Sequence, residues 1–396
     1  MLYSKIQKID LFAYILFFFL VLYFFNIFVI HQNFEKLISL KLLLLNYDGG
    51  FIRRALLGEI VTNVSSFLNV NFKYIFLLIH VINYSIFFYL NYLFFKKFKK
   101  NYIFYFFVFS PLYLTFTLGD VSSPYAEFLI QREIYLITFF LSFCYLIKKS
   151  KERMTIYFIG LIGISVMSFI YELTIITYPF FFTTYYFFLK KNDFKINIFE
   201  IVFAIIVCAA IIFLHLNQYG NNNLTLMINN LNEQFNLNYS ENDFMYSWIN
   251  KDIMDQINLY FADFKISYIF KYLFYSHPII LLLYIIFKYV DEKILLYLVY
   301  LSTISFLLIF AIAIDWARFV HILYCFILYV FFLIIDNEKI FVSLSRINFL
   351  NKINVKFLNL LVFFYCTFWT LKHTYWQNHL SYGIFKIIKK NLLYLY

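Results

Sequence analysis

The sequence has little charge, little glycine and little proline for its length. Of its 396 residues only 14% are charged, whereas 63% are hydrophobic and 25% aromatic, and there are 8 glycines and 4 prolines. Soluble globular chains average about 25% charged and roughly 45–50% apolar residues. The shortage of charge therefore excludes a soluble, a disordered or a collagen-like protein, because this much apolar surface needs lipid as its solvent.

Short motifs that mark several enzyme classes are missing as well. The four cysteines stand far apart inside apolar runs and form no CxxC pair, so neither a zinc site nor a redox pair is expected. The chain contains no Walker loop and no GxGxxG, HExxH or GxSxG sequence. We therefore expect no cofactor and name no metal ligand, while dependence on a divalent metal stays open.

Long apolar runs are what the chain has in place of charge. A membrane-spanning helix needs about 20 apolar residues. Such runs lie at 11–30, 73–95, 102–118, 133–148, 154–171, 172–189, 197–216, 268–287, 294–313, 317–335 and 356–371. The sequence thus predicts an all-α, polytopic membrane protein of about 11 transmembrane helices, within a range of roughly 10–12. It is expected to form one domain over residues 1–396, with a long outward loop at 217–267.

The connections between these runs differ in charge. One alternate set, which starts with residues 1–10, carries 19 lysines and arginines against 8 acids, and the other set carries 14 of each. Positive charge gathers on the cytoplasmic side of membrane proteins, so the N-terminus is expected there, with 11–30 as a signal anchor. The net charge of +11 indicates topology in a cell inner membrane, and no nucleic-acid partner is expected.

Arginine departs from this distribution. Four of the six arginines, Arg53, Arg54, Arg132 and Arg318, lie on the outward side, each within a few residues of an acid. Lysine would satisfy topology alone, but only the planar guanidinium matches phosphate or carboxylate with two parallel hydrogen bonds. The position of the arginines predicts an anion-binding site on the outward face.

The first outward cluster is Asn46-Tyr47-Asp48-Gly49-Gly50-Phe51-Ile52-Arg53-Arg54. The two glycines permit a tight turn, and apolar spacing from Ile52 to Leu68 predicts an amphipathic surface helix. Polar residues expected on its other face are Arg53, Arg54, Glu59, Thr62, Asn63 and Ser66. The start of this helix and its arginines would form an anion site beside the Asp48 carboxylate. The alternative is a glycine turn followed by arginines that reach lipid phosphates.

Two further outward clusters also pair arginine with acid. Glu127 and Arg132 follow a Ser-Pro sequence at 123–124 that is typical of a helix start, and the alternative is an ordinary polar loop. In Asp315-Trp316-Ala317-Arg318-Phe319-Val320-His321, Arg318 is one helical turn from both Asp315 and His321. Charge at the end of a span favours a functional site, and the alternative is a self-contained interfacial ion pair.

Three polar residues stand alone among the apolar runs. Glu172 lies between two runs and either faces the same outward vestibule or caps a hairpin turn. His80 and His215 are expected to be hydrogen-bonded core residues rather than ligands.

These features resemble the GT-C-fold glycosyltransferases and the bacterial O-antigen or capsule polymerases, which are polytopic and act on polyprenyl-linked sugars at the outer leaflet. The resemblance covers topology along most of the chain, and in detail only the segments 48–54 and 315–318. In the first group an acid lies in the first outward loop, where this chain has Asp48. The second acid usual in that loop is absent. In the polymerases outward arginines matter, and Arg53, Arg54, Arg132 and Arg318 match in location and type.

The resemblance implies a membrane glycosyltransferase or polysaccharide polymerase that takes sugar from a polyprenyl-phosphate-linked donor at the outer face. Its partners would be membrane lipid and the polyprenyl-linked sugar, with the oligomeric state open. The candidate catalytic residues are Asp48, Glu127 and Asp315, and the candidate substrate-binding residues are Arg53, Arg54, Arg132, Arg318, His321 and Glu172. The alternatives are a transporter or flippase of lipid-linked saccharides, whose sites usually lie in broken helices, and a non-catalytic membrane subunit.

Overall fold

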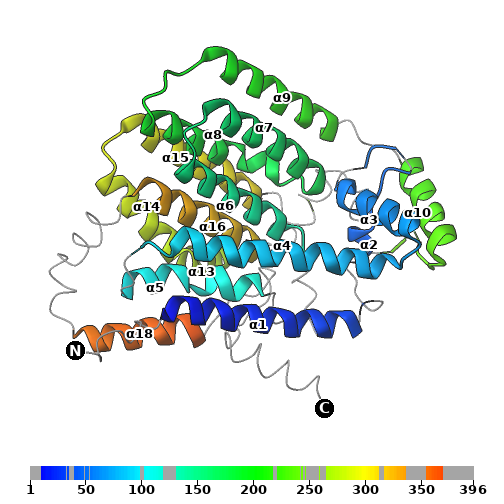
Figure 1. Cartoon of the computed structure of the whole chain (residues 1–396), viewed down its shortest axis with the longest axis horizontal. Helices are drawn as coiled ribbons and strands as arrows, with labels where there is room; N and C mark the ends of the chain where they lie inside the picture. Colours follow the sequence, from blue (N-terminus) through cyan, green and yellow to red (C-terminus); the bar gives the residue numbers. More distant parts are fainter. Residues whose placement is uncertain are drawn as a thin grey trace, which may run out of the picture.

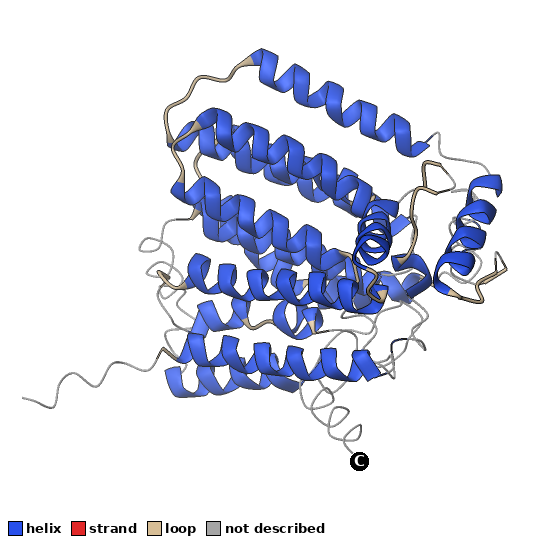
Figure 2. Ribbon diagram, turned by 45° about the vertical axis from the view of Figure 1, so that its right-hand side comes forward, coloured by secondary structure: helices blue, strands red, loops and turns tan. Residues whose placement is uncertain are grey.

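The computed structural model describes residues 10–32, 34, 40–48, 50–52, 54–98, 102–118, 131–216, 221–240, 242–243, 246, 258, 265–311, 316–335 and 354–368. Every element of secondary structure within these ranges is a helix (Figure 2). The long helices lie side by side with their axes roughly aligned (Figure 1). They are α1 (Leu11–Gln32), α4 (Phe72–Phe95), α6 (Glu133–Lys149), α7 (Arg153–Ile170), α8 (Thr174–Lys191), α9 (Ile198–Leu216), α15 (Lys293–Leu307) and α16 (Trp316–Ile334).

Several other helices are short or interrupted. Proline lacks a backbone N–H and so favours the first turn of a helix over its interior. Accordingly Pro111 opens the π-helix η2 (Pro111–Thr115) after α5 (Tyr102–Val108), and Pro278 lies in the first turn of α14 (His277–Tyr289). The axis of α14 is bent by 59° from that of α13 (Ile266–Tyr275). The remaining pieces are η4 (Leu308–Ala311), which continues α15, and α18 (Val355–Phe368).

The predicted helical class is confirmed, whereas the predicted number of spans is not. In the described ranges six helices are long and apolar enough to cross a membrane, or seven if the bent pair α13–α14 is one span. They are α1, α4, α7, α9, α15 with η4, and α16. Helices also form at the other predicted positions, but they are shorter or more polar; α6, for example, has 17 residues and carries Glu133, Lys148 and Lys149.

The helices differ in how far they are surrounded. In α16, 17 of the 19 residues are buried, which agrees with a sequence that is apolar on all sides. Its Phe326 ring stacks on Phe140 of α6 at a centroid distance of 4.0 Å. In contrast, α9 lies at the edge of the bundle (Figure 1) and exposes large apolar side chains such as Ile206 and Phe213. Exposed apolar side chains of this kind suit contact with lipid. Helix α16, by contrast, is surrounded by other helices and forms the core of the bundle.

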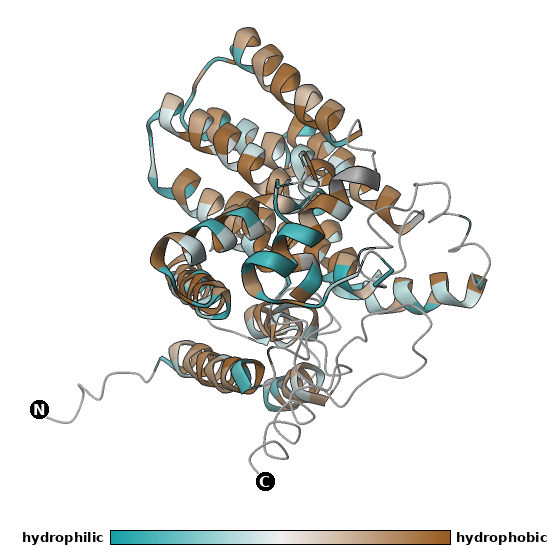
Figure 3. Ribbon diagram, turned by 90° about the vertical axis from the view of Figure 1, so that its right-hand side faces the viewer, coloured by the Kyte–Doolittle hydropathy of each residue, from teal (hydrophilic) through white to brown (hydrophobic). Residues whose placement is uncertain are grey.

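Three short helices gather at one end of the bundle (Figures 1 and 3): α2 (Leu40–Leu43), α3 (Ala55–Leu68) and α10 (Asn221–Phe235). Helix α10 lies inside the segment that the sequence predicts as a long loop. It buries Leu224, Met227, Ile228 and Leu231, one apolar stripe at helical spacing. Phe235 contacts Phe72 of α4, and Lys41 of α2 pairs with Asp243 just after α10 at 2.5 Å. This part of the predicted loop is therefore folded against the bundle.

The face that α3 presents to the rest of the protein is rich in small residues. The helix begins at Ala55, not at Ile52, and it buries its small residues Ala55, Gly58, Thr62 and Ser65 together with Leu57 and Val61. The larger apolar side chains of Ile60 and Phe67 point outward. Helices in lipid gain nothing from hiding apolar chains from one another, so they pack through small residues instead. The apolar residues of the predicted amphipathic helix are therefore divided: Leu57 and Val61 are buried in the protein, whereas Ile60 and Phe67 are exposed, as they would be toward lipid.

Three predictions for isolated polar residues are confirmed. The α7–α8 hairpin turns at Glu172, as one of the two alternatives for that residue required. The hydroxyl of Tyr135 lies 3.1 Å from Nδ1 of His80. Nε2 of His215 lies 3.0 Å from the carbonyl oxygen of Ser168 and thereby ties the end of α9 to α7. Both histidines are hydrogen-bonded core residues.

Candidate functional site: an arginine–glutamate cluster at one end of the bundle

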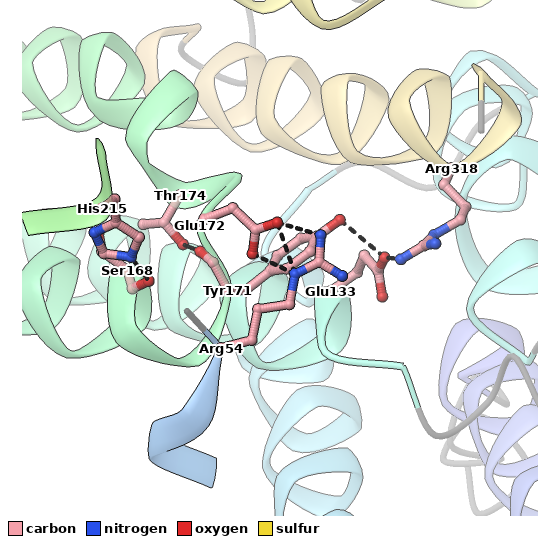
Figure 4. Close-up of polar contacts among 8 residues, drawn as sticks. All are labelled: Arg54, Glu133, Ser168, Tyr171, Glu172, Thr174, His215 and Arg318. Carbon is pink, nitrogen blue, oxygen red and sulfur yellow. Dashed lines mark hydrogen bonds and ion pairs between the residues drawn. The ribbon is translucent and has the colours of Figure 1, made fainter. Parts of the chain in front are cut away.

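Charged residues from four separate parts of the chain meet at the end of the bundle that carries α3. Arg54 immediately precedes α3, Arg132 and Glu133 begin α6, Glu172 lies in the α7–α8 turn, and Arg318 lies in the first turn of α16. Figure 4 shows Arg54, Glu172, Tyr171, Glu133 and Arg318 reaching toward one another across this end. Of the predicted site residues, Arg54, Arg132, Glu172 and Arg318 are therefore brought together at one end of the bundle.

Arg54 and Glu172 form the first ion pair of the cluster. Nε of Arg54 lies 2.6 Å and 2.5 Å from the two carboxylate oxygens, and Nη2 also pairs with Oε1. The guanidinium lies over the ring of Tyr171, 5.8 Å from its centroid. Arg54 adopts φ 66°, a left-handed backbone conformation that is rare for a residue with a side chain. The residue immediately precedes the first residue of α3. The backbone is therefore bent at the residue whose side chain reaches Glu172.

Glu133 and Arg318 form the second ion pair. Nη2 of Arg318 pairs with Oε1 of Glu133, and the hydroxyl of Tyr171 donates a hydrogen bond of 3.0 Å to the same oxygen. The Glu133 side chain is only 8% exposed. Its second oxygen, Oε2, is buried and accepts no hydrogen bond from any described residue. A buried carboxylate oxygen of this kind is expensive unless a proton or another donor reaches it.

Arg132 is 5% exposed, and its charge interacts with Arg54 and Glu172 of the first pair and with Arg318 of the second. Burial and the nearby charge of Arg54 lower its pKa to about 9, and Glu172 acts in the opposite direction. The guanidinium is therefore still protonated at neutral pH. The charges of Arg54 and Arg132 also act on Arg318. Three buried or half-buried guanidinium groups within electrostatic range of one another favour the binding of an anion near them.

A small cavity of about 30 Å³ adjoins the second ion pair. Its polar lining includes Glu133, Arg318, His321 and Gln131, and its apolar lining includes Phe116 and Ile134. Nδ1 of His321 lies 2.6 Å from the carbonyl oxygen of Leu112; because a carbonyl only accepts, Nδ1 carries the proton. A cavity needs roughly 10–15 Å³ for one water. The space therefore holds water-sized groups, and a sugar would enter only if the surrounding side chains moved.

The structure separates the predicted site residues into three groups. Arg54, Arg132, Arg318, His321 and Glu172 belong to the cluster or to the cavity beside it. Asp48 does not pair with them: it is exposed, and its carboxylate accepts a hydrogen bond of 2.9 Å from Nδ2 of Asn46. Arg53, Glu127 and Asp315 lie outside the described residues.

Sequence reasoning missed two residues that complete the cluster. Glu133 follows Arg132 directly at the start of an apolar run, but it was not among the predicted site residues. Tyr171 was one of 37 tyrosines and carried no signal of its own. The available signal for both residues was their position along the chain, on the arginine-rich side rather than near the lysine-rich connections. A carboxylate and a hydroxyl on that side are expected to pair with the arginines there.

A second arginine–glutamate pair lies at the opposite end of α7 and provides a comparison. Nη2 of Arg153 lies 2.8 Å from Oε2 of Glu200, which also accepts a hydrogen bond of 2.7 Å from the hydroxyl of Tyr185. Oε1 of Glu200 lies 3.5 Å from Nδ2 of Asn197. Both oxygens of this carboxylate therefore have donors, and the pair fastens α9 to α7 and α8. The cluster differs, because Glu133 keeps one oxygen without a donor.

Comparison of the chain with protein-family models, with curated proteins and with solved structures finds no match. The described residues also contain no group of three or more histidine, cysteine, aspartate or glutamate side chains suited to hold a metal ion. The chemistry of this end of the bundle therefore has to be argued from the cluster itself.

Proposed function

We propose that the protein is a membrane glycosyltransferase or polysaccharide polymerase that transfers a sugar from a polyprenyl-phosphate-linked donor. The observation that carries this proposal is the convergence of Arg54, Arg132 and Arg318 with two glutamates at one end of a bundle of apolar helices. Guanidinium groups match phosphate oxygens in charge and in geometry. A site at the end of a bundle also suits a substrate whose tail lies in lipid and whose phosphate lies at the boundary with water.

In this proposal the arginines hold the donor phosphate and Glu133 is the general base. An acceptor hydroxyl transfers its proton to Oε2 of Glu133 while its oxygen bonds to the anomeric carbon of the donor sugar. The bond between that carbon and the phosphate oxygen breaks, and the lipid phosphate leaves with the electron pair. Arg54, Arg132 and Arg318 stabilise the charge that develops on the departing oxygen. Glu133 takes the role that the sequence assigned to Asp48, because Glu133 pairs with Arg318, whereas the carboxylate of Asp48 accepts a hydrogen bond from Asn46.

The proposal includes about 11 spans, a cytoplasmic N-terminus and a cluster on the outer side of a cell inner membrane. The lysines support this orientation. Lys148 and Lys149 end α6, and Lys190 and Lys191 end α8, whereas both helices begin at the cluster. The basic residues and the cluster therefore lie at opposite ends of these two helices. Labelling of single introduced cysteines from outside the cell checks this: a cysteine at Asn69, which is exposed at the end of α3, should react and one at Lys149 should not.

A transporter or flippase of lipid-linked saccharides is the second candidate, and interrupted helices favour it. The chain breaks between α13 and α14 and between α5 and η2, and residues at both breaks contact Tyr365 of α18. Ser110 lies 3.1 Å from the hydroxyl of Tyr365, whose ring contacts His277 at a centroid distance of 5.6 Å. Transporter sites are usually built from such broken helices. These breaks carry no described arginine cluster, which is why the transferase is preferred.

Deletion of the protein from its host, followed by analysis of the surface glycan, tests the proposal. Glycans with a single repeat would identify a polymerase, and loss of one sugar would identify a transferase. A lipid-linked intermediate that accumulates on the cytoplasmic leaflet would support the flippase instead. An unchanged glycan would contradict both and leave a non-catalytic subunit. Complementation with Glu133→Gln, checked for normal membrane levels, should fail if Glu133 is the base.

A further inference from the structure

The two ion pairs of the cluster occupy the same hydrogen-bond donors that a phosphate group would use. Glu172 takes Nε and Nη2 of Arg54, and Glu133 takes Nη2 of Arg318. A carboxylate resembles one edge of a phosphate: two oxygens, negative charge and bidentate contact with a guanidinium. A donor phosphate can therefore take over these bidentate donors only if the glutamates give up their places.

Electrostatics adds a second reason for competition. A diphosphate diester brings two negative charges into a site that already holds two carboxylates with little exposure to water. Like charges in a partly buried site repel strongly, because the effective dielectric constant is well below that of water. Phosphate and both carboxylates cannot all remain close to the arginines at the same time without a large penalty.

The Arg153–Glu200 pair at the other end of α7 differs from the cluster in how fully its carboxylate is hydrogen-bonded. Both carboxylate oxygens of Glu200 have donors, so the pair with Arg153 is complete. In the cluster, Oε2 of Glu133 is buried without a donor among the described residues, and the Glu133 residue lines the cavity. The Glu133–Arg318 pair is thus incompletely satisfied, and such pairs are poor structural fasteners.

The geometry points to an exchange of partners at this site, an inference that rests on the proposed function. The diphosphate of the donor displaces Glu172 from Arg54 and Glu133 from Arg318, and the two carboxylates act as internal stand-ins for it until then. Once Arg318 turns to the phosphate, Glu133 loses the cation that stabilises its charged form and becomes a stronger base. The base is therefore activated only when the donor is bound, which limits proton abstraction in its absence.

The test uses the full-length protein, its variants Glu172→Gln and Glu133→Gln, and the matched control Glu200→Gln. All are purified in the same nonionic detergent. Glu172→Gln removes the charge that competes for Arg54 and keeps the shape of the side chain. Glu200→Gln does the same to the complete pair at the other end of α7. Isothermal titration calorimetry measures the binding of inorganic diphosphate and, separately, of farnesyl diphosphate, which adds a short prenyl tail.

Exchange predicts that Glu172→Gln binds inorganic diphosphate about tenfold more tightly than the wild type, because a competing anion is gone. Glu133→Gln should tighten binding in the same direction and lose sugar transfer. Glu200→Gln should leave both affinities unchanged. Tighter binding of farnesyl diphosphate than of inorganic diphosphate would assign the site to a lipid headgroup, and equal affinities would assign it to a free diphosphate.

The opposite result overturns the inference without touching the proposed function. If the Arg54–Glu172 pair only shapes the site, Glu172→Gln should weaken diphosphate binding or leave it unchanged while the wild type still binds. If the wild type and all variants fail to bind either probe, the proposed function falls as well. If Glu172→Gln tightens binding but the wild type transfers no sugar, the exchange stands and the transferase does not.

Discussion

Replacement of Gly58 by alanine should displace α3 and with it Arg54. A Cβ atom at this position would lie 2.0 Å from the carbonyl oxygen of Leu45 and 2.8 Å from the carbonyl carbons of Leu44 and Leu45. Ordinary contact begins at 3.4 Å, so one segment must move by about 1.4 Å. The obstructing atoms belong to the backbone, and rotation of a side chain cannot relieve them.

The expected loss of stability is close to 3 kcal/mol, the upper end of the roughly 1–3 kcal/mol usual for an overpacked core. The functional effect should be larger. Arg54 lies four residues before Gly58 and is held just before the same helix. A misplacement of about 1 Å at a catalytic site can lower a rate about 100-fold. We therefore expect folded Gly58→Ala protein to transfer sugar about 100-fold more slowly than the wild type.

Gly160→Ala is the matched control. Its Cβ would lie 3.0 Å from ring atoms of Phe143, a side chain that can shift by a few tenths of an ångström. The free energy of unfolding in mixed micelles of nonionic detergent and dodecyl sulfate should fall by less than about 1 kcal/mol, with transfer near the wild-type rate. If Gly58→Ala unfolds like the wild type and transfers sugar within about twofold of its rate, the contact of α3 with Leu45 does not position Arg54.

Three further changes have defined outcomes. Arg54→Lys keeps the charge but loses the planar fork, so diphosphate affinity measured by calorimetry should fall roughly tenfold; an unchanged affinity would exclude bidentate contact. Asp48→Asn should leave the free energy of unfolding within about 0.5 kcal/mol and should retain transfer, since Asp48 is exposed, and a loss of activity would return Asp48 to the mechanism. Asp243→Asn should release α10 to proteases. Burial raises the pKa of Asp243, but the ion pair with Lys41 and the hydrogen bond from the backbone N–H of Ser240 together lower it to below its ordinary value. The protection is therefore complete at neutral pH and should be lost as the pH falls through the lowered pKa. Equal protection of wild type and variant at pH 7 would show that the pair does not hold α10.

The helical class and the positions of the helices could be predicted because both depend on local composition. An apolar run of about 20 residues has no stable alternative to a helix in lipid, since each backbone polar group must be satisfied within the segment. This argument locates helices at all the predicted runs, including the α7–α8 hairpin. It gives no reliable count of spans, because short or broken helices such as α5 with η2 carry the same signal as complete ones.

The face of α3 and the fold within residues 217–267 could not be predicted by the same means. An amphipathic pattern indicates which face of a helix is buried in the protein only when the opposite face contacts water. In lipid the small residues Gly58 and Thr62 mark the packed face of α3, and only the neighbouring segment at Leu45 reveals this. Helix α10 has a low mean hydropathy and gains its stability from packing on α4 and α3.

The sequence by itself determined that the chain needs lipid, that its lysines and arginines are separated, and that Arg54, Arg132, Arg318 and Glu172 belong to one end of the bundle. These conclusions follow from composition and from alternation along the chain. Only the tertiary structure decided which acid meets which arginine. Arg54 and Glu172 are 118 positions apart, and Glu133 pairs with an arginine on α16 rather than with its neighbour Arg132. Ion pairs between helices depend on how those helices pack, and no local pattern records that packing.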